Sequence, residues 1–355
     1  MANHHLSAEP PERSDAAIAK KTVKHVKFGR TGLKVSELCL GTMTFGFQCD
    51  EPESAAIMDT AFDAGITFID AADMYPNGHT GELAGDTERI IGRWMQASPG
   101  RRGDVVLASK FYAPMGKNPW DMGGSRKHIL NAIDGSLERL QTDYLDLYQI
   151  HFWDRETPLD ETLGALDDVV RAGKVRYIGC SNYAAWQLAR AIGRSEALGI
   201  VRYESVQPRY NLLFRNAERE LFPLCDHDDV AVIPYNPLAG GFLTGKHKTL
   251  DEPTAGGRFE HGSQAQRYRE RYWAEDKFSM VEQMRPLAEA AGISMAQMAV
   301  GWTLANPTVT APIVGASKPE QLADAVAATE SPIDPALKDE LDELTLHYRV
   351  VDALR

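Results

Sequence analysis

Four side chains able to exchange protons stand at or just after the ends of three separate apolar runs. Asp70, Lys110 and His151 each end such a run, and Tyr75 follows Asp70 by five residues. A phenol normally has a pKa near 10, and an adjacent ammonium lowers it by favouring the phenolate. The sequence therefore predicts that Tyr75 beside Lys110 transfers protons to and from an oxygen. Asp70 would be the counter-ion of Lys110, and His151 would donate a hydrogen bond to a carbonyl.

Each of these residues alone has an ordinary structural interpretation. Asp70 could cap a strand end, Tyr75 could anchor a loop, Lys110 could be a solvated strand end, and His151 could be a hydrogen-bonded core histidine. The catalytic interpretation depends on the runs being neighbouring parallel strands. Only then do the four side chains meet at one rim, where they suit protonation of an oxygen while a hydride reaches the adjoining carbon.

The elements that would position these residues are short apolar runs alternating with helix-length amphipathic segments. Eight such runs are found at residues 38–41, 65–70, 105–110, 144–151, 175–181, 205–207, 230–235 and 309–315. The alternation predicts an α/β protein with a single (β/α)8 TIM barrel, whose active site lies at the C-terminal ends of the strands. An open doubly wound sheet is the alternative.

Helices are expected at residues 54–64, 125–141, 159–172 and 184–198, three of them followed by a glycine that suits a left-handed cap. A short hairpin over residues 23–36 is expected to plug the bottom of the barrel. Two long loops, at 112–125 after the third strand and at 236–276 after the seventh, are expected to be lids or binding loops.

The domain organisation follows from this pattern. Residues 1–22 are polar and are expected to be a flexible tail, 23–335 to form the barrel domain, and 336–355 to form a helical extension.

Composition restricts the possible partners. The chain of 355 residues is 43% hydrophobic, has no long apolar run and carries a net charge of −12, so neither a membrane span nor a nucleic-acid partner is expected. The tail has no hydrophobic signal region, and the four cysteines form no CxxC pair; reduced thiols in a cytoplasmic protein are expected. No HExxH or paired-cysteine motif predicts a metal. Nothing marks an oligomer interface.

No Rossmann fingerprint indicates a nucleotide site, because no GxGxxG follows a strand. The stretch 240–246 matches most of a phosphate loop, but His247 replaces the Ser or Thr that would hold Mg²⁺, so a nucleotide-hydrolysing loop is not expected. Glycines can let backbone N–H groups approach an anion, but the sequence itself shows only a glycine-rich loop after a strand. At 315–322 a strand runs into a helix N-terminus, where Ser317 and Lys318 either help to bind an anion or simply cap the helix.

The segments 65–75, 143–151 and 173–182 resemble the aldo-keto reductase family, and the resemblance covers residues 26–329 in the form of the longer bacterial members. It implies a (β/α)8 barrel and a catalytic tetrad on Asp70, Tyr75, Lys110 and His151. It also implies NADPH-dependent reduction of aldehydes or ketones, which runs in reverse as an alcohol dehydrogenase.

The same resemblance implies how the cofactor is held. Ser181, Asn182 and Gln207 look like the groups that bind the nicotinamide carboxamide, and Tyr235 like the ring that stacks on the nicotinamide. The complete set of implied cofactor contacts is Gly41, Thr42, Met43, Ser181, Asn182, Gln207, Tyr235, Asn236, Pro237, Leu238, Gly240, Gly241, Leu243, Gly245, Lys246, Gly315, Ser317, Lys318, Gln321 and Asp324. Asp324-Ala325 stands where many relatives have Glu-Asn, and NADP is favoured over NAD.

Two other functions remain open from the sequence. One is an NADP(H)-binding regulatory or redox-sensing subunit with low turnover, which could retain the whole tetrad. The other is a barrel hydrolase, which would usually need a second carboxylate beside the substrate. A small-molecule carbonyl compound is the expected substrate, and the aromatics Tyr112, Trp120, Phe152 and Trp153 favour an apolar or ring-bearing one.

Overall fold

The computed structural model describes residues 22–350 apart from 77–82, 252, 254–256 and 261. The predicted tail, 1–22, lies outside the described residues except for Thr22. The last five residues of the predicted C-terminal extension also lie outside them.

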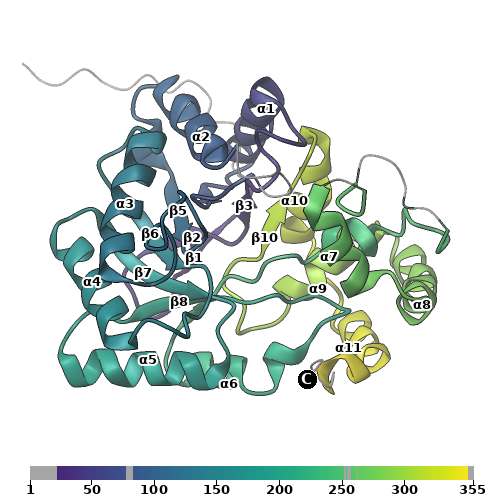
Figure 1. The fold of residues 1–355 in the computed structure, drawn as a ribbon. Helices are drawn as coiled ribbons and strands as arrows, with labels where there is room; N and C mark the ends of the chain where they lie inside the picture. Colours follow the sequence, from purple (N-terminus) through teal and green to yellow (C-terminus); the bar gives the residue numbers. More distant parts are fainter. Residues whose placement is uncertain (1–21, 77–82, 252, 254–256, 261, 351–355) are drawn as a thin grey trace, which may run out of the picture.

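Eight parallel strands form the central sheet, in the order β10-β3-β4-β5-β6-β7-β8-β9, and helices surround it (Figure 1). The strands are β3 (Cys39–Gly41), β4 (Phe68–Asp70), β5 (Val106–Phe111), β6 (Leu145–Ile150), β7 (Val175–Ser181), β8 (Tyr203–Gln207), β9 (Ala231–Val232) and β10 (Ile313–Gly315). Isolated parallel bridges join β9 and β10, the two strands at the ends of this order, with each other's flanking residues: Val232 pairs with Val309, and Ile313 pairs with Tyr235. The sheet therefore closes into the predicted (β/α)8 barrel rather than an open doubly wound sheet.

The last two strands are shorter than the sequence indicates. Runs at 230–235 and 309–315 were expected to be strands, but regular pairing covers only β9 and β10. Pro234 and Pro312 lie within these runs and have no N–H to donate to a ladder. Here the barrel is closed by isolated backbone hydrogen bonds, such as the one from the Ile313 N–H to the Pro234 carbonyl, at 2.8 Å.

The predicted helices are present within a few residues of their expected bounds. The helices are α1 (Glu51–Asp63), α2 (Asp86–Gln96), α3 (Arg126–Leu140), α4 (Leu159–Arg171), α5 (Ala185–Leu198), α6 (Leu221–His227), α7 (Gly262–Tyr272), α8 (Glu275–Ala291), α9 (Met295–Leu304), α10 (Ala323–Glu330) and α11 (Pro335–Leu344). α1 begins three residues before the expected start because Asp50 and Glu53 form a reciprocal capping box. α5 ends at Gly199, which has a left-handed φ of 64°.

The N-terminal hairpin plugs the barrel as expected. β1 (His25–Lys27) and β2 (Lys34–Ser36) pair antiparallel. Phe28 and Val35, both fully buried, join the apolar cluster inside the barrel. The ring of Phe28 meets that of Phe68 edge to face, with centroids 6.0 Å apart. Burial of such a ring contributes about 1.5–3 kcal/mol, so the hairpin stabilises the end of the barrel opposite the site described below.

The two long connections differ from each other. Residues 112–125 form an irregular loop, as expected. The connection after β9 instead contains a 3-10 segment, η3 (Ala239–Thr244), and the helix α7. The sequence of α7 is polar apart from its tyrosines, so no apolar periodicity marks it as a helix. It is held by Tyr268 and Tyr272, which are 5% and 1% exposed.

Two further observations concern membranes and thiols. Among the helices described, none has both the length and the apolar character that a membrane crossing requires. The four cysteines are free and buried.

Candidate active site

The four proton-exchanging side chains meet at the C-terminal ends of three adjacent strands. Asp70 ends β4, Lys110 lies near the end of β5, His151 directly follows β6, and Tyr75 lies on the loop after β4. The Lys110 ammonium donates to the Asp70 carboxylate at 2.6 Å and to the Ala71 carbonyl at 2.8 Å, and its Nζ lies 3.3 Å from the Tyr75 hydroxyl. The strand pairing therefore brings together the groups that the sequence placed at one rim.

Lys110 keeps its charge although it is fully buried. Burial acts to lower the pKa of this ammonium, but the nearby Asp70 carboxylate and the Tyr75 hydroxyl outweigh burial, so the pKa is raised. A permanent positive charge thus lies beside the Tyr75 hydroxyl.

The pKa of Tyr75 shifts in the opposite direction from the sequence-based expectation. Burial raises the pKa of this phenol, and the attraction of Lys110 only partly offsets burial. The expected depression is therefore wrong, because the sequence does not show that the ring is 7% exposed. Tyr75 is a neutral phenol that carries its proton at neutral pH. Lys110 would stabilise the phenolate left after that proton is given up.

His151 is a neutral imidazole. Its pKa is held well below the usual range, first by burial and then by the positive charges of Lys110 and Arg267. Its ring contacts that of Tyr75 edge to face, at 5.9 Å between centroids, and stacks on Phe152 at 4.9 Å. A neutral imidazole retains one N–H, so His151 can donate to a carbonyl oxygen that also receives the Tyr75 proton.

Asp70 is held by two buried amides. Gln149 and Gln207 each donate through Nε2 to Asp70 Oδ1, at 3.1 and 3.0 Å. The sequence analysis did not select Gln149. Strand alternation could have found it, since Gln149 lies two residues before His151 and pairs in register with Lys110.

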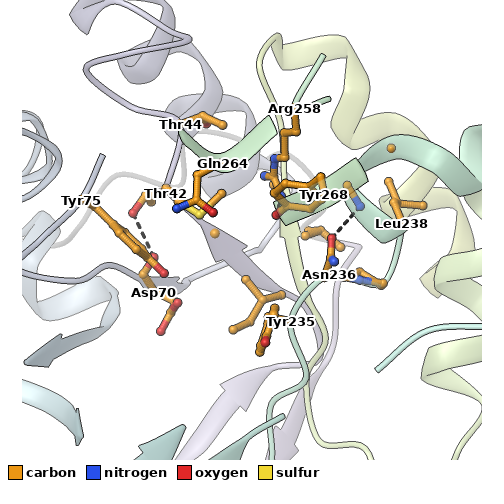
Figure 2. Close-up of a pocket in the computed structure, with 18 of the residues that line it drawn as sticks. Thr42, Thr44, Asp70, Tyr75, Tyr235, Asn236, Leu238, Arg258, Gln264 and Tyr268 are labelled. Atoms are coloured by element: carbon orange, nitrogen blue, oxygen red, sulfur yellow. Dashed lines mark hydrogen bonds between the residues drawn. The ribbon is translucent and has the colours of Figure 1, made fainter. Parts of the chain in front are cut away.

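A cavity of about 620 Å³ lies over this group of side chains, and Figure 2 shows part of its lining. In that view Asp70 and Tyr75 lie on one side, Arg258 and Tyr268 on the other, and Gln264 between them. Of the expected cofactor contacts, those that line the cavity are Gly41, Thr42, Met43, Ser181, Asn182, Gln207, Tyr235, Asn236, Pro237, Leu238, Gly240, Gly241, Lys246, Gly315, Ser317, Gln321 and Asp324.

Three expected cofactor contacts do not line the cavity. Leu243 is fully buried in the apolar core. Gly245 faces the guanidinium of Arg285. Lys318 is exposed at the N-cap of η4 (Pro319–Leu322).

One end of the cavity has an aromatic ring fixed by amide and hydroxyl groups. The Tyr235 hydroxyl donates to Asn182 Oδ1 at 2.9 Å, and Asn182 Nδ2 lies 3.0 Å from both Ser181 Oγ and the His151 carbonyl. Asn182 has a left-handed φ of 58°, which asparagine tolerates better than most residues. This network joins the expected stacking ring to the expected carboxamide-binding groups, and fits a nicotinamide.

The glycine-rich loop has two of its amides bonded internally. The Gly240 N–H donates to Asn236 Oδ1 at 2.6 Å and the Gly241 N–H to the Leu238 carbonyl at 2.8 Å, so both amides are bonded within the loop. Gly240 has a φ of 73°, and a Cβ there would lie 2.5 Å from the ring of Tyr268. The glycines thus let α7 pack closely on the loop, which is a role the sequence alone did not indicate.

Two cationic side chains lie close together in the cavity. Lys246 and Arg258 both line the cavity, and burial together with the charge of Arg258 lowers the pKa of Lys246. Arg258 also donates to the Tyr268 hydroxyl at 3.2 Å. Two cations close together in a cavity suit a diphosphate.

Another part of the lining combines a hydroxyl with a helix entry. Gln321 Oε1 accepts from the Ser317 N–H at 2.8 Å and lies 3.2 Å from Ser317 Oγ. Asp324 lines the cavity too, but its carboxylate accepts from Ser294 Oγ at 2.8 Å. The cavity thus holds an aromatic ring, two cations and these polar groups, and this set of residues fits a dinucleotide.

The cofactor contacts expected from the sequence do not include the lining contributed by the segment around α7. These residues are Gly257, Arg258, Gln264, Arg267, Tyr268 and Arg271. The sequence pattern could have grouped four of them, because 264, 267, 268 and 271 follow helical spacing and share one face of a helix. Among the described residues, no three His, Cys, Asp or Glu side chains gather closely enough to hold a metal ion.

Comparison with known proteins gives one matching family and several relatives that align over most of the chain. The Aldo/keto reductase family matches over residues 37–345. An uncharacterized oxidoreductase of Bacillus subtilis, YrpG, is 41% identical over 91% of this chain and 96% of its own. A probable voltage-gated potassium channel subunit beta of Oryza sativa is 36% identical, over 87% and 92%. The versiconal hemiacetal acetate reductase of Aspergillus parasiticus is 35% identical, over 90% and 96%.

Proposed function

The chain belongs to the aldo/keto reductase family and is an NAD(P)-dependent oxidoreductase, and on that premise we propose that it reduces aldehydes or ketones to alcohols with NADPH, reversibly, with Tyr75 as the proton donor. The observation that carries the proposal is the buried group at the strand ends. In it the Lys110 ammonium lies 3.3 Å from the Tyr75 hydroxyl and 2.6 Å from the Asp70 carboxylate.

The chain's own residues would act on the carbonyl oxygen. Tyr75 and the neutral His151 would both donate hydrogen bonds to it, which polarises the carbonyl and orients it. A bound nicotinamide cofactor supplies a hydride to the carbonyl carbon. The Tyr75 proton passes to the oxygen, and the phenolate that remains is stabilised by Lys110, whose charge Asp70 balances. In the reverse direction the phenolate accepts the alcohol proton.

The preference for NADPH over NADH is part of the same proposal. Its support is the pair of Ser317 and Gln321, which lie close together in the lining of the cavity, with the exposed Lys318 next to Ser317 in the chain. A 2′-phosphate would add negative charge at a helix entry and beside a lysine, and both favour an anion.

The deciding experiment measures cofactor binding and turnover together. Quenching of tryptophan fluorescence by NADPH and by NADH, at the same salt concentration, gives the two dissociation constants. Oxidation of NADPH is then followed with a panel of aldehydes and ketones. We expect tighter binding of NADPH than of NADH and turnover of at least part of the panel. Failure to bind either cofactor would overturn the proposal.

A second function is favoured by one finding. Relatives named as probable potassium channel beta subunits match most of this chain, so an NADP(H)-binding regulatory subunit with low turnover is the alternative. Its test is molecular size by light scattering with and without cofactor. A cofactor-dependent change in assembly, together with slow turnover of every carbonyl compound, would favour the regulatory function over the reductase.

A further inference from the structure

A second cavity, of about 440 Å³, opens beside the first. It lies among the start of α5, the segment that follows β8, and α7. Asn182, Tyr235 and Arg271 line both cavities. The two cavities are therefore neighbours that share these wall residues, and they adjoin where Tyr235 is held.

Arg209 is the residue that distinguishes the second cavity from the first. It follows β8 and forms a parallel bridge with Tyr235, so the strand ends fix its backbone directly beside the shared wall. Its guanidinium carbon lies 3.5 Å from the ring centroid of Phe214, which holds the planar group in place. Arg209 is half-buried and lines only the second cavity.

No described carboxylate forms an ion pair with Arg209. The charged groups that face it are the cations Arg271 and Lys277, and its side chain is hydrogen-bonded to Tyr272, a neutral group. Burial lowers the pKa of Arg209, and Arg271 lowers it further. A half-buried guanidinium next to a second cation is unfavourable unless an anion joins them.

A second buried arginine nearby differs from Arg209 in having carboxylate partners. Arg215, six residues further along, is buried and paired, at 2.8 Å with Glu218 and at 3.2 Å with Asp342. Within the second cavity the described carboxylate is Glu220, which is exposed and forms no described ion pair with Arg209 or Arg271.

The balance of charge in the second cavity is therefore positive. Arg209, Arg219 and Arg271 line it against Glu220. Arg267 adds another cation in the first cavity, close enough to lower the pKa of His151. This local charge contrasts with the net charge of −12 on the whole chain.

We propose that the second cavity is a subsite for a carboxylate of the substrate, so that the preferred substrates are aldehydes or ketones that also carry a carboxylate. This inference rests on the proposed reductase function. Guanidinium groups bind planar carboxylates through paired hydrogen bonds. The cofactor diphosphate has its own cations, Lys246 and Arg258, which line only the first cavity.

The test compares two substrates that differ in one group, a carboxylate that is free in one and methyl-esterified in the other. 4-Formylbenzoate and methyl 4-formylbenzoate present the same ring and aldehyde, with and without the carboxylate. With saturating NADPH, we expect kcat/KM to be about tenfold or more higher for the carboxylate, since charged hydrogen bonds are the strong ones. In Arg209→Gln the preference for the carboxylate should be lost, so that the two kcat/KM values become similar. Arg209→Lys should keep part of the preference.

The matched control is Arg190→Gln, which removes the same charge from an exposed position on α5. It should leave the ratio unchanged, which would exclude an effect of overall charge. A separate titration with NADPH should give the same dissociation constant for the wild type and for Arg209→Gln. A weaker NADPH complex of Arg209→Gln would mean that Arg209 serves the cofactor, and would overturn the inference.

The remaining outcomes separate this inference from the reductase proposal. If kcat/KM for the ester equals kcat/KM for the carboxylate, the carboxylate subsite is wrong and the reductase function stands. If neither is reduced, the reductase function is in question, and calorimetric binding of terephthalate to the NADP⁺ complex decides the subsite. Weaker terephthalate binding by Arg209→Gln than by the wild type supports it, and equal binding overturns it.

Discussion

The proton-transfer group and the wall that faces it across the cavity are built in different ways. Asp70, Lys110 and His151 lie at the ends of three adjacent strands, and Lys110 and Asp70 are almost completely buried. The facing wall comes from η3 and α7, which lie on one long connection after β9, and from the half-buried Arg258 between them. Strand register therefore positions the chemistry, and a loop-borne wall determines what is held against it.

The largest expected effect comes from removing the Tyr75 hydroxyl, which belongs to the strand side. Tyr75→Phe should lower kcat by about 10²–10⁴-fold, the usual contribution of a positioned general acid. NADPH affinity, measured by fluorescence, should be nearly unchanged because the facing wall remains. Tyr112→Phe, which removes another hydroxyl that lines the cavity, should affect kcat far less. Near-normal turnover by Tyr75→Phe would contradict the assigned role.

The second prediction concerns stability on the strand side. Lys110→Met leaves the Asp70 carboxylate buried without its partner, which should lower the free energy of unfolding by about 3–5 kcal/mol. Lys174→Met is the control, because its pair with Asp134 is exposed and such pairs contribute about 0–1 kcal/mol. Urea denaturation of both variants measures the difference. Equal losses would show that the buried pair is not special.

The third prediction breaks the facing wall instead. Gly240→Ala places a Cβ against Tyr268 at a left-handed φ, which costs about 1–2 kcal/mol in backbone strain alone. Displacement of α7 should raise the NADPH dissociation constant by about tenfold. Gly193→Ala makes the same change where a Cβ meets nothing within 4 Å, and should leave the dissociation constant as it is. Unchanged NADPH binding in Gly240→Ala would show that the packing of α7 on this loop is not needed.

The smallest expected effect is that of pH. The pKa of Tyr75 is raised above its ordinary value of 10.0, so its hydroxyl stays protonated through neutral pH and loses the proton only as pH rises through the raised value. The pKa of His151 is lowered well below 6.5, so His151 does not titrate between pH 6 and 9. Single-turnover reduction should therefore be nearly flat over that range. A transition near pH 6.5 would show that His151 ionises in the working enzyme.

The sequence predicted the strand side of this comparison better than the facing wall. Apolar runs with a functional residue at the end are a local signal, so the grouping of Asp70, Lys110 and His151 could be expected. The direction of the Tyr75 pKa could not, because burial of that ring depends on the whole cavity. The helix α7 was missed because its sequence is polar. The pairing of Arg209 with Tyr235 depends on register between strand ends, which no local pattern specifies.

Gln207 gives the cavity a property that neither region has alone. Its amide donates to Asp70 and lies among the groups expected to meet the cofactor. A ligand that moves this amide also alters the field at Lys110 and so its affinity for a proton. Linkage makes such an effect reciprocal, because protonation must change cofactor affinity by the same factor. A calorimetric titration of NADPH in buffers of different ionisation enthalpy, at an alkaline pH where Lys110 starts to lose its proton, would count the protons exchanged, and so measure this coupling in a resting enzyme without any substrate.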